Sequence, residues 1–150
     1  MKRLTIFLAL ACAYSCQDAH HLSPLDIVGT WENTTLNVEV STVSNSDSSS
    51  ILSIDIGEWE KTLNIKPIST TYWADGTFVS VYRGLDGQEI GKEEGNWSIR
   101  NDSLILSSSN YNNAYRVTIQ NEQARFVSYL DWDQDGSKDD LYDGWQIKVE

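Results

Sequence analysis

The acidic segment that begins at Asp131 is the part of the sequence best suited to chemistry. Residues 131–143 read DWDQDGSKDDLYD and hold six aspartates opposed by one lysine. Carboxylates confined in so small a volume repel one another strongly. Oxygen ligands at every second residue suit a hard divalent cation, and Gly136 permits the sharp turn that folds both halves of the segment onto it. The segment therefore predicts a structural calcium ion with these ligands: Asp131, Asp133, Asp135, Ser137, Asp139 and Asp143.

The spacing resembles that of an EF-hand loop, which places oxygen ligands at alternate positions and glycine at the sixth. Tyr142 stands where an EF-hand carries its bidentate acid, and Lys138 stands where it carries an apolar residue. Asp140 or Asp143 would then supply the missing carboxylate, as in the helix-free calcium loops of thrombospondin-type repeats, which the segment also resembles. The alternative is a solvated hairpin tip whose aspartates cap backbone amides.

Enzyme chemistry is limited by the residue types that the sequence lacks. After Cys16 there is no cysteine, and after His21 there is no histidine. Cys–His and Ser–His–Asp groups and histidine-based metal sites therefore cannot form within the folded domain. Two pairs of acids remain for a glycosidase-type mechanism: Glu58 with Glu60, and Glu93 with Glu94. Such acids are also common as solvated charge on strand edges, and we expect no enzymatic activity.

The first residues have the composition of a secretory signal. A basic start, Lys2-Arg3, precedes the apolar run of residues 4–11, and small residues follow. The run is too short to cross a bilayer as a helix, which needs about 20 residues. We therefore expect residues 1–15 to be a signal peptide.

Cys16 closes the segment AYSC, which resembles a bacterial lipobox. The resemblance implies a lipid on Cys16 and a protein anchored in the bacterial cell envelope, at the outer membrane. Cys12 closes a second candidate, ALAC, and an ordinary cleaved signal is the remaining alternative. Residues 16–26 would be the lipidated N-terminus and a polar tether, in which His20 and His21 suit a solvated linker better than a metal site. The folded domain would span residues 27–150.

The rest of the chain has the pattern of an all-β domain. Period-two alternation and β-branched or aromatic residues recur between Gly, Asn, Asp and Ser turns, and no long stretch has helical spacing. The expected strands are 29–40, 51–58, 61–73, 77–83, 88–99, 103–108, 114–120, 124–131 and 142–149. Pro67 should kink or split the third strand.

Short polar connectors indicate that consecutive strands pair as neighbours in a meander. The serine-rich residues 41–50 are the exception and are expected to form a long loop. Eight or nine strands can close as an antiparallel up-and-down β-barrel or stack as a β-sandwich. Closure has the advantage that it removes exposed edges.

Four short motifs resemble the lipocalin-like lipoproteins of Bacteroidetes-type bacteria. They are 29–31 (GTW), 75–78 (DGTF), 95–97 (GNW) and 102–104 (DSL), and the resemblance runs over about residues 25–149. It implies a lipocalin-like barrel in which Trp31 plugs the closed end. In lipocalins an arginine of the last strand packs across this tryptophan, whereas the nearest basic residue here is Lys148. The resemblance also implies a small apolar ligand inside the barrel.

Alternation places many apolar side chains on one face of their strands, where they form either plain core or a ligand cavity. The candidate ligand contacts among them are Trp31, Phe78, Trp97, Tyr115 and Phe126.

Charge and composition leave three classes of function. The net charge of −11 repels phosphate backbones and disfavours a nucleic-acid partner. The first class is the small-molecule binding that the resemblance implies. The second is a carbohydrate-binding module, because 6 Trp and 7 Tyr offer stacking surfaces to a glycan. The third is a ligand-free interaction or assembly subunit of a surface complex. A vacant apolar cavity would favour the first class, and exposed aromatic residues the others.

Overall fold

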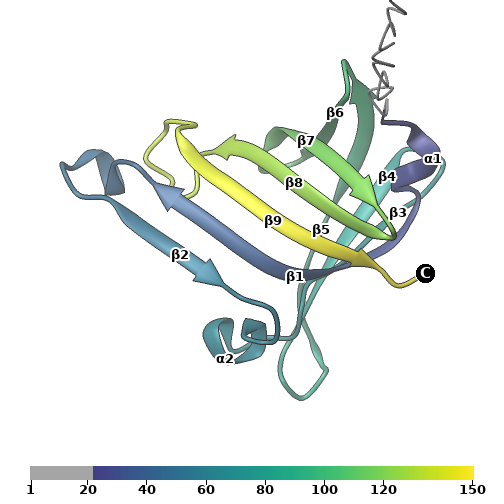
Figure 1. The fold of residues 1–150 in the computed structure, drawn as a ribbon, viewed down its shortest axis with the longest axis horizontal. Helices are drawn as coiled ribbons and strands as arrows, with labels where there is room; N and C mark the ends of the chain where they lie inside the picture. Colours follow the sequence, from purple (N-terminus) through teal and green to yellow (C-terminus); the bar gives the residue numbers. More distant parts are fainter. Residues whose placement is uncertain (1–21) are drawn as a thin grey trace, which may run out of the picture.

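Alternating side chains build a closed β-barrel in the computed structural model, which describes residues 22–150 (Figure 1). Eight antiparallel strands form the barrel, so the predicted fold class is confirmed. The signal peptide predicted over residues 1–15, both cysteines and both histidines lie outside the described residues.

Nine strands and three short helical segments make up the described chain. In chain order they are α1 (Pro24–Ile27), β1 (Gly29–Val40), the 3₁₀ turn η1 (Val43–Asn45), β2 (Ser50–Ile54), α2 (Trp59–Leu63), β3 (Ser69–Tyr72), β4 (Thr77–Arg83), β5 (Glu89–Arg100), β6 (Ser103–Ser108), β7 (Asn112–Gln120), β8 (Gln123–Leu130) and β9 (Asp140–Lys148).

Strand β1 closes the barrel because both of its edges are paired. One edge pairs with β9 from Trp31 to Glu39. The other edge pairs first with β3, over residues 29–32, and then with β2, over residues 36–40. From β3 to β9 the strands pair in sequence order, which confirms the meander there. The prediction is wrong at β2 and β3, which do not pair with each other but share one edge of β1.

The strand predicted over residues 61–73 is also wrong in its first half. Residues 59–63 form α2, which ends where Asn64 adopts a left-handed conformation with φ of 58°. Trp59 and Leu63, four residues apart, lie on the same face of this helix. Strand β3 begins at Ser69, two residues after Pro67, which cannot donate to a ladder. A second helix, α1, lies in the predicted tether, where the Ser23 side chain and Asp26 form a capping box.

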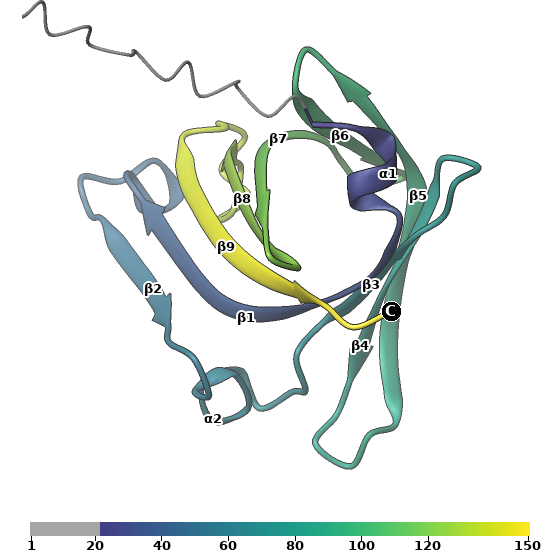
Figure 2. The same ribbon diagram turned by 45° about the vertical axis from the view of Figure 1, so that its right-hand side comes forward.

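The connections divide the barrel into two ends. Segments 73–76, 101–102 and 121–122 join strands at the end where α1 lies, here called the α1 end (Figure 2). Segments 41–49, 84–88, 109–111 and 131–139 lie at the opposite end, here called the loop end. Both residues of the 101–102 and 121–122 turns have positive φ, the geometry of tight hairpins.

Trp31 fills the barrel at the α1 end. Its side chain is fully buried, and its Nε1 donates a 2.8 Å hydrogen bond to the carbonyl oxygen of Ile27. The Nζ of Lys148 lies 5.4 Å from the centroid of the Trp31 ring. A lysine therefore makes the cation–π contact for which the lipocalin resemblance implied an arginine. Trp31 and Trp97 are both buried, as expected for side chains on the inward face of their strands.

Replacing Trp31 should cost much of the stability of the domain. We expect Trp31→Ala to lower the free energy of unfolding by about 3 kcal/mol or more, because it leaves a large cavity and removes the Ile27 hydrogen bond. Trp73→Ala is the matched control, since the Trp73 side chain is 45% exposed, and it should cost less than about 1 kcal/mol. Urea unfolding followed by far-ultraviolet circular dichroism measures both. Equal losses in the two variants would contradict the role of Trp31 as the plug.

Candidate functional site

The barrel encloses a cavity of about 410 Å³, here called the barrel cavity. This volume lies within the range of small-molecule sites, roughly 300–1,000 Å³. The lining is rich in aromatic rings from many parts of the fold: Trp59, Tyr72, Tyr82, Tyr111, Tyr115, Phe126, Trp132 and Tyr142. Leucines and isoleucines make up most of the remaining lining residues: Leu36, Leu52, Leu63, Ile65, Ile68, Leu106 and Leu130.

Small residues at inward-facing positions leave room for the aromatic rings that line the barrel cavity. Thr70 of β3 and Ser80 of β4 line the cavity and share a 2.8 Å hydrogen bond between their hydroxyl oxygens. On β9, a Cβ added to Gly144 would lie 2.6 Å from the Tyr142 hydroxyl oxygen. Any side chain at Gly144 would therefore displace the Tyr142 ring from the cavity wall.

The segment from β2 to β3, which includes α2, completes the wall of the barrel cavity where the barrel strands do not cover it. Strand β3 covers only the first part of β1, and α2 lies between β2 and the β4–β5 hairpin in both views (Figures 1 and 2). Trp59 of α2 packs with Leu36, Val38 and Ile54 in a second apolar cluster. These contacts make α2 part of the cavity wall. The sequence gives no clear signal for this helix, because residues four apart, such as Trp59 and Leu63, share a face in a helix and in a strand alike.

None of the side chains that line the barrel cavity in the described chain is charged. Burial raises the pKa of Tyr115 to about 12 and also raises the pKa of Tyr142 and Tyr72. Loss of hydration disfavours the phenolate, so these hydroxyls keep their protons at neutral pH. The cavity is therefore electrically neutral.

Two residues of the lining carry buried polar atoms without a hydrogen-bond partner among the described residues. They are the Nε1 of Trp59 and the Oε1 of Gln146, and both side chains are more than nine-tenths buried. Gln146 is two residues before Lys148 on β9, and Lys148 pairs with Trp31. Gln146 therefore lies on the side of the cavity that faces the Trp31 plug. An unsatisfied buried group costs about 1–3 kcal/mol. The lining thus has one donor and one acceptor that the protein itself does not use.

The structure divides the predicted ligand contacts into two groups. Tyr115 and Phe126 line the barrel cavity. Trp31, Phe78 and Trp97 lie in the packed core toward the α1 end and do not line it. Tyr72 connects the groups, because its ring lies 6.1 Å from those of both Phe78 and Trp97. Alternation predicts that all these side chains point inward, but it does not predict how deep in the barrel each one lies.

The acidic segment forms the β8–β9 loop and brings three of its predicted ligands together. One carboxylate oxygen from each of Asp131, Asp133 and Asp135 lies within 4.8 Å of the others. These carboxylates also accept backbone amides: Asp131 from Gly136, Asp133 from Asp135 at 3.2 Å, and Asp135 from Ser137 at 2.8 Å. Amide capping and cation binding both require such converging oxygens.

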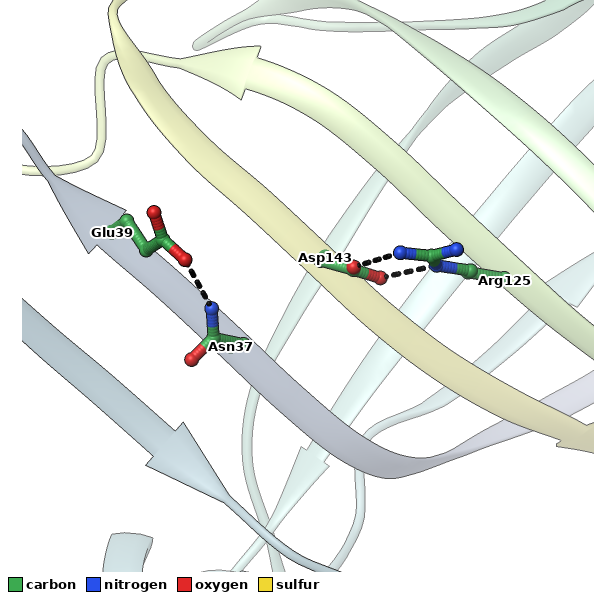
Figure 3. Close-up of polar contacts among 4 residues, drawn as sticks. All are labelled: Asn37, Glu39, Arg125 and Asp143. Carbon is green, nitrogen blue, oxygen red and sulfur yellow. Dashed lines mark hydrogen bonds and ion pairs between the residues drawn. The ribbon is translucent and has the colours of Figure 1, made fainter.

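The remaining predicted ligands have other contacts. Asp143 accepts a 2.8 Å hydrogen bond from Nε of Arg125 on the outer face of β8 and β9, beside the Asn37–Glu39 contact of β1 (Figure 3). Asp139 lies 3.5 Å from the Thr42 hydroxyl, and Ser137 contributes its backbone amide to Asp135. Asp140, which is only 1% exposed, accepts the backbone amides of Trp132 and Asp133.

The paired acids lie on the surface beside cationic or amide groups. Glu58 pairs with Lys61 at 2.6 Å, Glu60 with Lys66 at 2.8 Å, and Glu94 with Lys92 at 2.9 Å. Glu93 accepts a long hydrogen bond from Asn110. No pair of these acids lines the barrel cavity.

Comparison with known proteins gives no family for the chain. No protein-family model matches it, and no curated protein matches its sequence. In the part of the chain that the structure describes, no helix has the length and apolar character to cross a membrane. The function is therefore inferred from the barrel cavity and the loops beside it.

Calcium should stabilise the domain through the β8–β9 loop. With affinity in the range of extracellular modules, about 10⁻⁴–10⁻³ M, calcium at five times its Kd should add about 1 kcal/mol of stability and raise Tm by about 3 °C. Thermal melts and calorimetry measure this, and the Asp133→Ala, Asp135→Ala double variant should lose the response. The exposed pair Asp47→Ala, Asp55→Ala removes the same charge elsewhere and should keep it. Absence of both heat and a Tm shift at millimolar calcium would contradict the metal site.

Proposed function

We propose that the protein is a lipid-anchored, lipocalin-like protein of the bacterial cell envelope that binds a small, mainly apolar ligand inside its barrel. The observation that carries this proposal is the barrel cavity, which has the volume of a ligand site and an aromatic, uncharged lining. A barrel of eight strands is just wide enough for side chains to fill it or for one small ligand. Here the side chains fill the α1 end, and a cavity remains toward the loop end.

The lining defines the chemistry of the ligand. Burying a charge without a partner is costly, and the cavity offers no counter-charge, so the part of the ligand inside the barrel is uncharged. Aromatic walls contact flat or aliphatic surfaces through large areas and favour edge or offset ring contacts. An acceptor group on the ligand would satisfy Trp59 Nε1, and a donor group would satisfy Gln146 Oε1.

The sequence around Cys16 supports the anchor. The apolar run, the small residues and the polar chain that follows are the pattern of a lipoprotein signal. Several acyl chains hold a protein on a membrane far more firmly than one. The described chain begins with Leu22, which packs with Ile27 and Trp31 at the α1 end. A membrane anchor at Cys16 would therefore be attached to the end opposite the loops.

Cys16 should be required for membrane attachment. In the native host, Cys16→Ala should move the protein from the membrane to the soluble fraction, because the thiol that carries the lipid is lost. Cys12→Ala is the matched control and should leave the protein in the membrane fraction. If only Cys12→Ala moves the protein to the soluble fraction, Cys12 and not Cys16 carries the lipid.

A filled cavity should bind no ligand. Protein purified from its own cells should carry a small uncharged molecule in native mass spectrometry, and 2-naphthol should bind the emptied protein with a change in naphthol fluorescence. Ser80→Trp places an indole in the cavity and should abolish both results. Val81→Trp adds the same ring at the neighbouring position, which faces away from the barrel interior, and should preserve both. No retained molecule and no naphthol binding in the unmodified protein would contradict the proposed function and favour a ligand-free interaction subunit.

A further inference from the structure

A second hollow adjoins the mouth of the barrel cavity. It has a volume of about 620 Å³ and lies between the β6–β7 turn and the β8–β9 loop; we call it the rim hollow. Four residues line both spaces: Tyr111, Asn113, Leu130 and Trp132. The two spaces are therefore adjacent, and a ligand that occupied both would pass beside these four side chains.

The two spaces differ in chemistry. The barrel cavity is lined mainly by apolar and aromatic groups, whereas the rim hollow adds the amide side chains of Asn110 and Gln134 and the charged groups of Asp131 and Lys138. A ligand that matches both has an apolar body and a polar head.

The charged groups of the rim hollow already have partners within the protein. Lys138 Nζ donates to the carbonyl oxygen of Asn112 at 2.7 Å and to Oδ1 of Asn113 at 3.0 Å. Asp131 accepts the backbone amide of Gly136 at 3.2 Å. The lining thus holds one charged group of each sign, and both are engaged within the protein, so neither is left to pair with a charged ligand. The polar head that suits it is uncharged.

Trp132 gives the hollow an aromatic face. The Trp132 side chain is 41% exposed, while its backbone nitrogen donates a 2.7 Å hydrogen bond to the buried carboxylate of Asp140. The Trp132 ring lies 6.3 Å from that of Tyr142, which lines the barrel cavity. A sugar ring has an apolar C–H face and a rim of hydroxyls, and an aromatic ring beside amide groups matches both surfaces.

From this arrangement we infer that the ligand is amphiphilic, with an apolar body in the barrel cavity and an uncharged, polyhydroxylated head of the glycosyl type in the rim hollow. This inference rests on the proposed function, because the body of the ligand occupies the barrel cavity. It also accounts for the exposed tryptophan at the rim, which small-molecule binding in the barrel does not require.

Naphthalene derivatives test the inference on the full chain. Calorimetry compares 2-naphthol, 2-naphthyl glucoside, 2-naphthyl galactoside, 2-naphthyl phosphate and glucose alone. We expect at least one glycoside to bind about ten-fold tighter than 2-naphthol, the phosphate to bind more weakly than that glycoside, and glucose alone to show no binding.

Gln134→Gly is the most selective variant. Gln134 has φ of 62°, which glycine adopts without strain, so the change removes the amide and keeps the loop. It should lower the glycoside affinity toward that of 2-naphthol and change the 2-naphthol affinity by less than about two-fold. Asn121→Gly, at φ of 50° in a turn of the α1 end, is the matched control and should change neither affinity. Trp132→Ala should also remove the advantage of the glycoside, and Trp73→Ala should not.

The outcomes separate this inference from the proposed function. If 2-naphthol binds and neither glycoside binds more tightly, the inference is overturned and the barrel ligand stands. The same holds if Gln134→Gly and Trp132→Ala leave the advantage of the glycoside intact, or if the phosphate binds best. If 2-naphthol and both glycosides fail to bind, both the inference and the proposed function are overturned.

Discussion

The pairing of β1 with β9 is the constraint on which the rest of the structure depends. Without it the strands would form an open sheet with two exposed edges, a common cause of aggregation. With it, the inward face of every barrel strand is enclosed, and its side chains must either fill the interior or leave a cavity. Trp31 lies where β1 meets β9, paired with Lys148, so the plug and the closure share the same residues.

The interior is filled at one end only, because the size of the inward side chains changes along the barrel. Trp31, Phe78 and Trp97 lie in one buried cluster with Ile27 of α1. Around the cavity, Thr70 and Ser80 take inward positions, and Gly144 leaves the space that the Tyr142 ring occupies. Strand β3 is also short, so β2 and α2 close the wall from outside the ring of strands. The cavity therefore follows from small inward residues and from one short strand.

Much of the fold could be predicted from the sequence, since period-two alternation states directly which face of a strand is buried. The strands predicted over 29–40, 77–83 and 103–108 have the observed bounds. The strand predicted over 61–73 fails because a five-residue helix is too short to establish a period, and Trp59 and Leu63 fit either pattern. The cavity itself could not be predicted. Alternation places Tyr115 and Trp97 on the same interior face, but only the three-dimensional packing shows that one lines a cavity and the other lies in the core.

The acidic β8–β9 loop is best understood together with the mouth of the cavity. Asp140 is buried at the start of β9 and holds the backbone amides of Trp132 and Asp133, so a single carboxylate fixes the aromatic residue that both hollows share. Asp133 also accepts the backbone amide of Ser44, which links this loop to the β1–β2 loop across the rim. Carboxylates are suited to this task because each accepts two or more amides at once, and such charge-assisted hydrogen bonds are about twice as strong as neutral ones. Aspartates of the segment that resembles a calcium loop therefore hold the β1–β2 and β8–β9 loops together. They also hold the backbone of Trp132, whose side chain lines both the barrel cavity and the rim hollow.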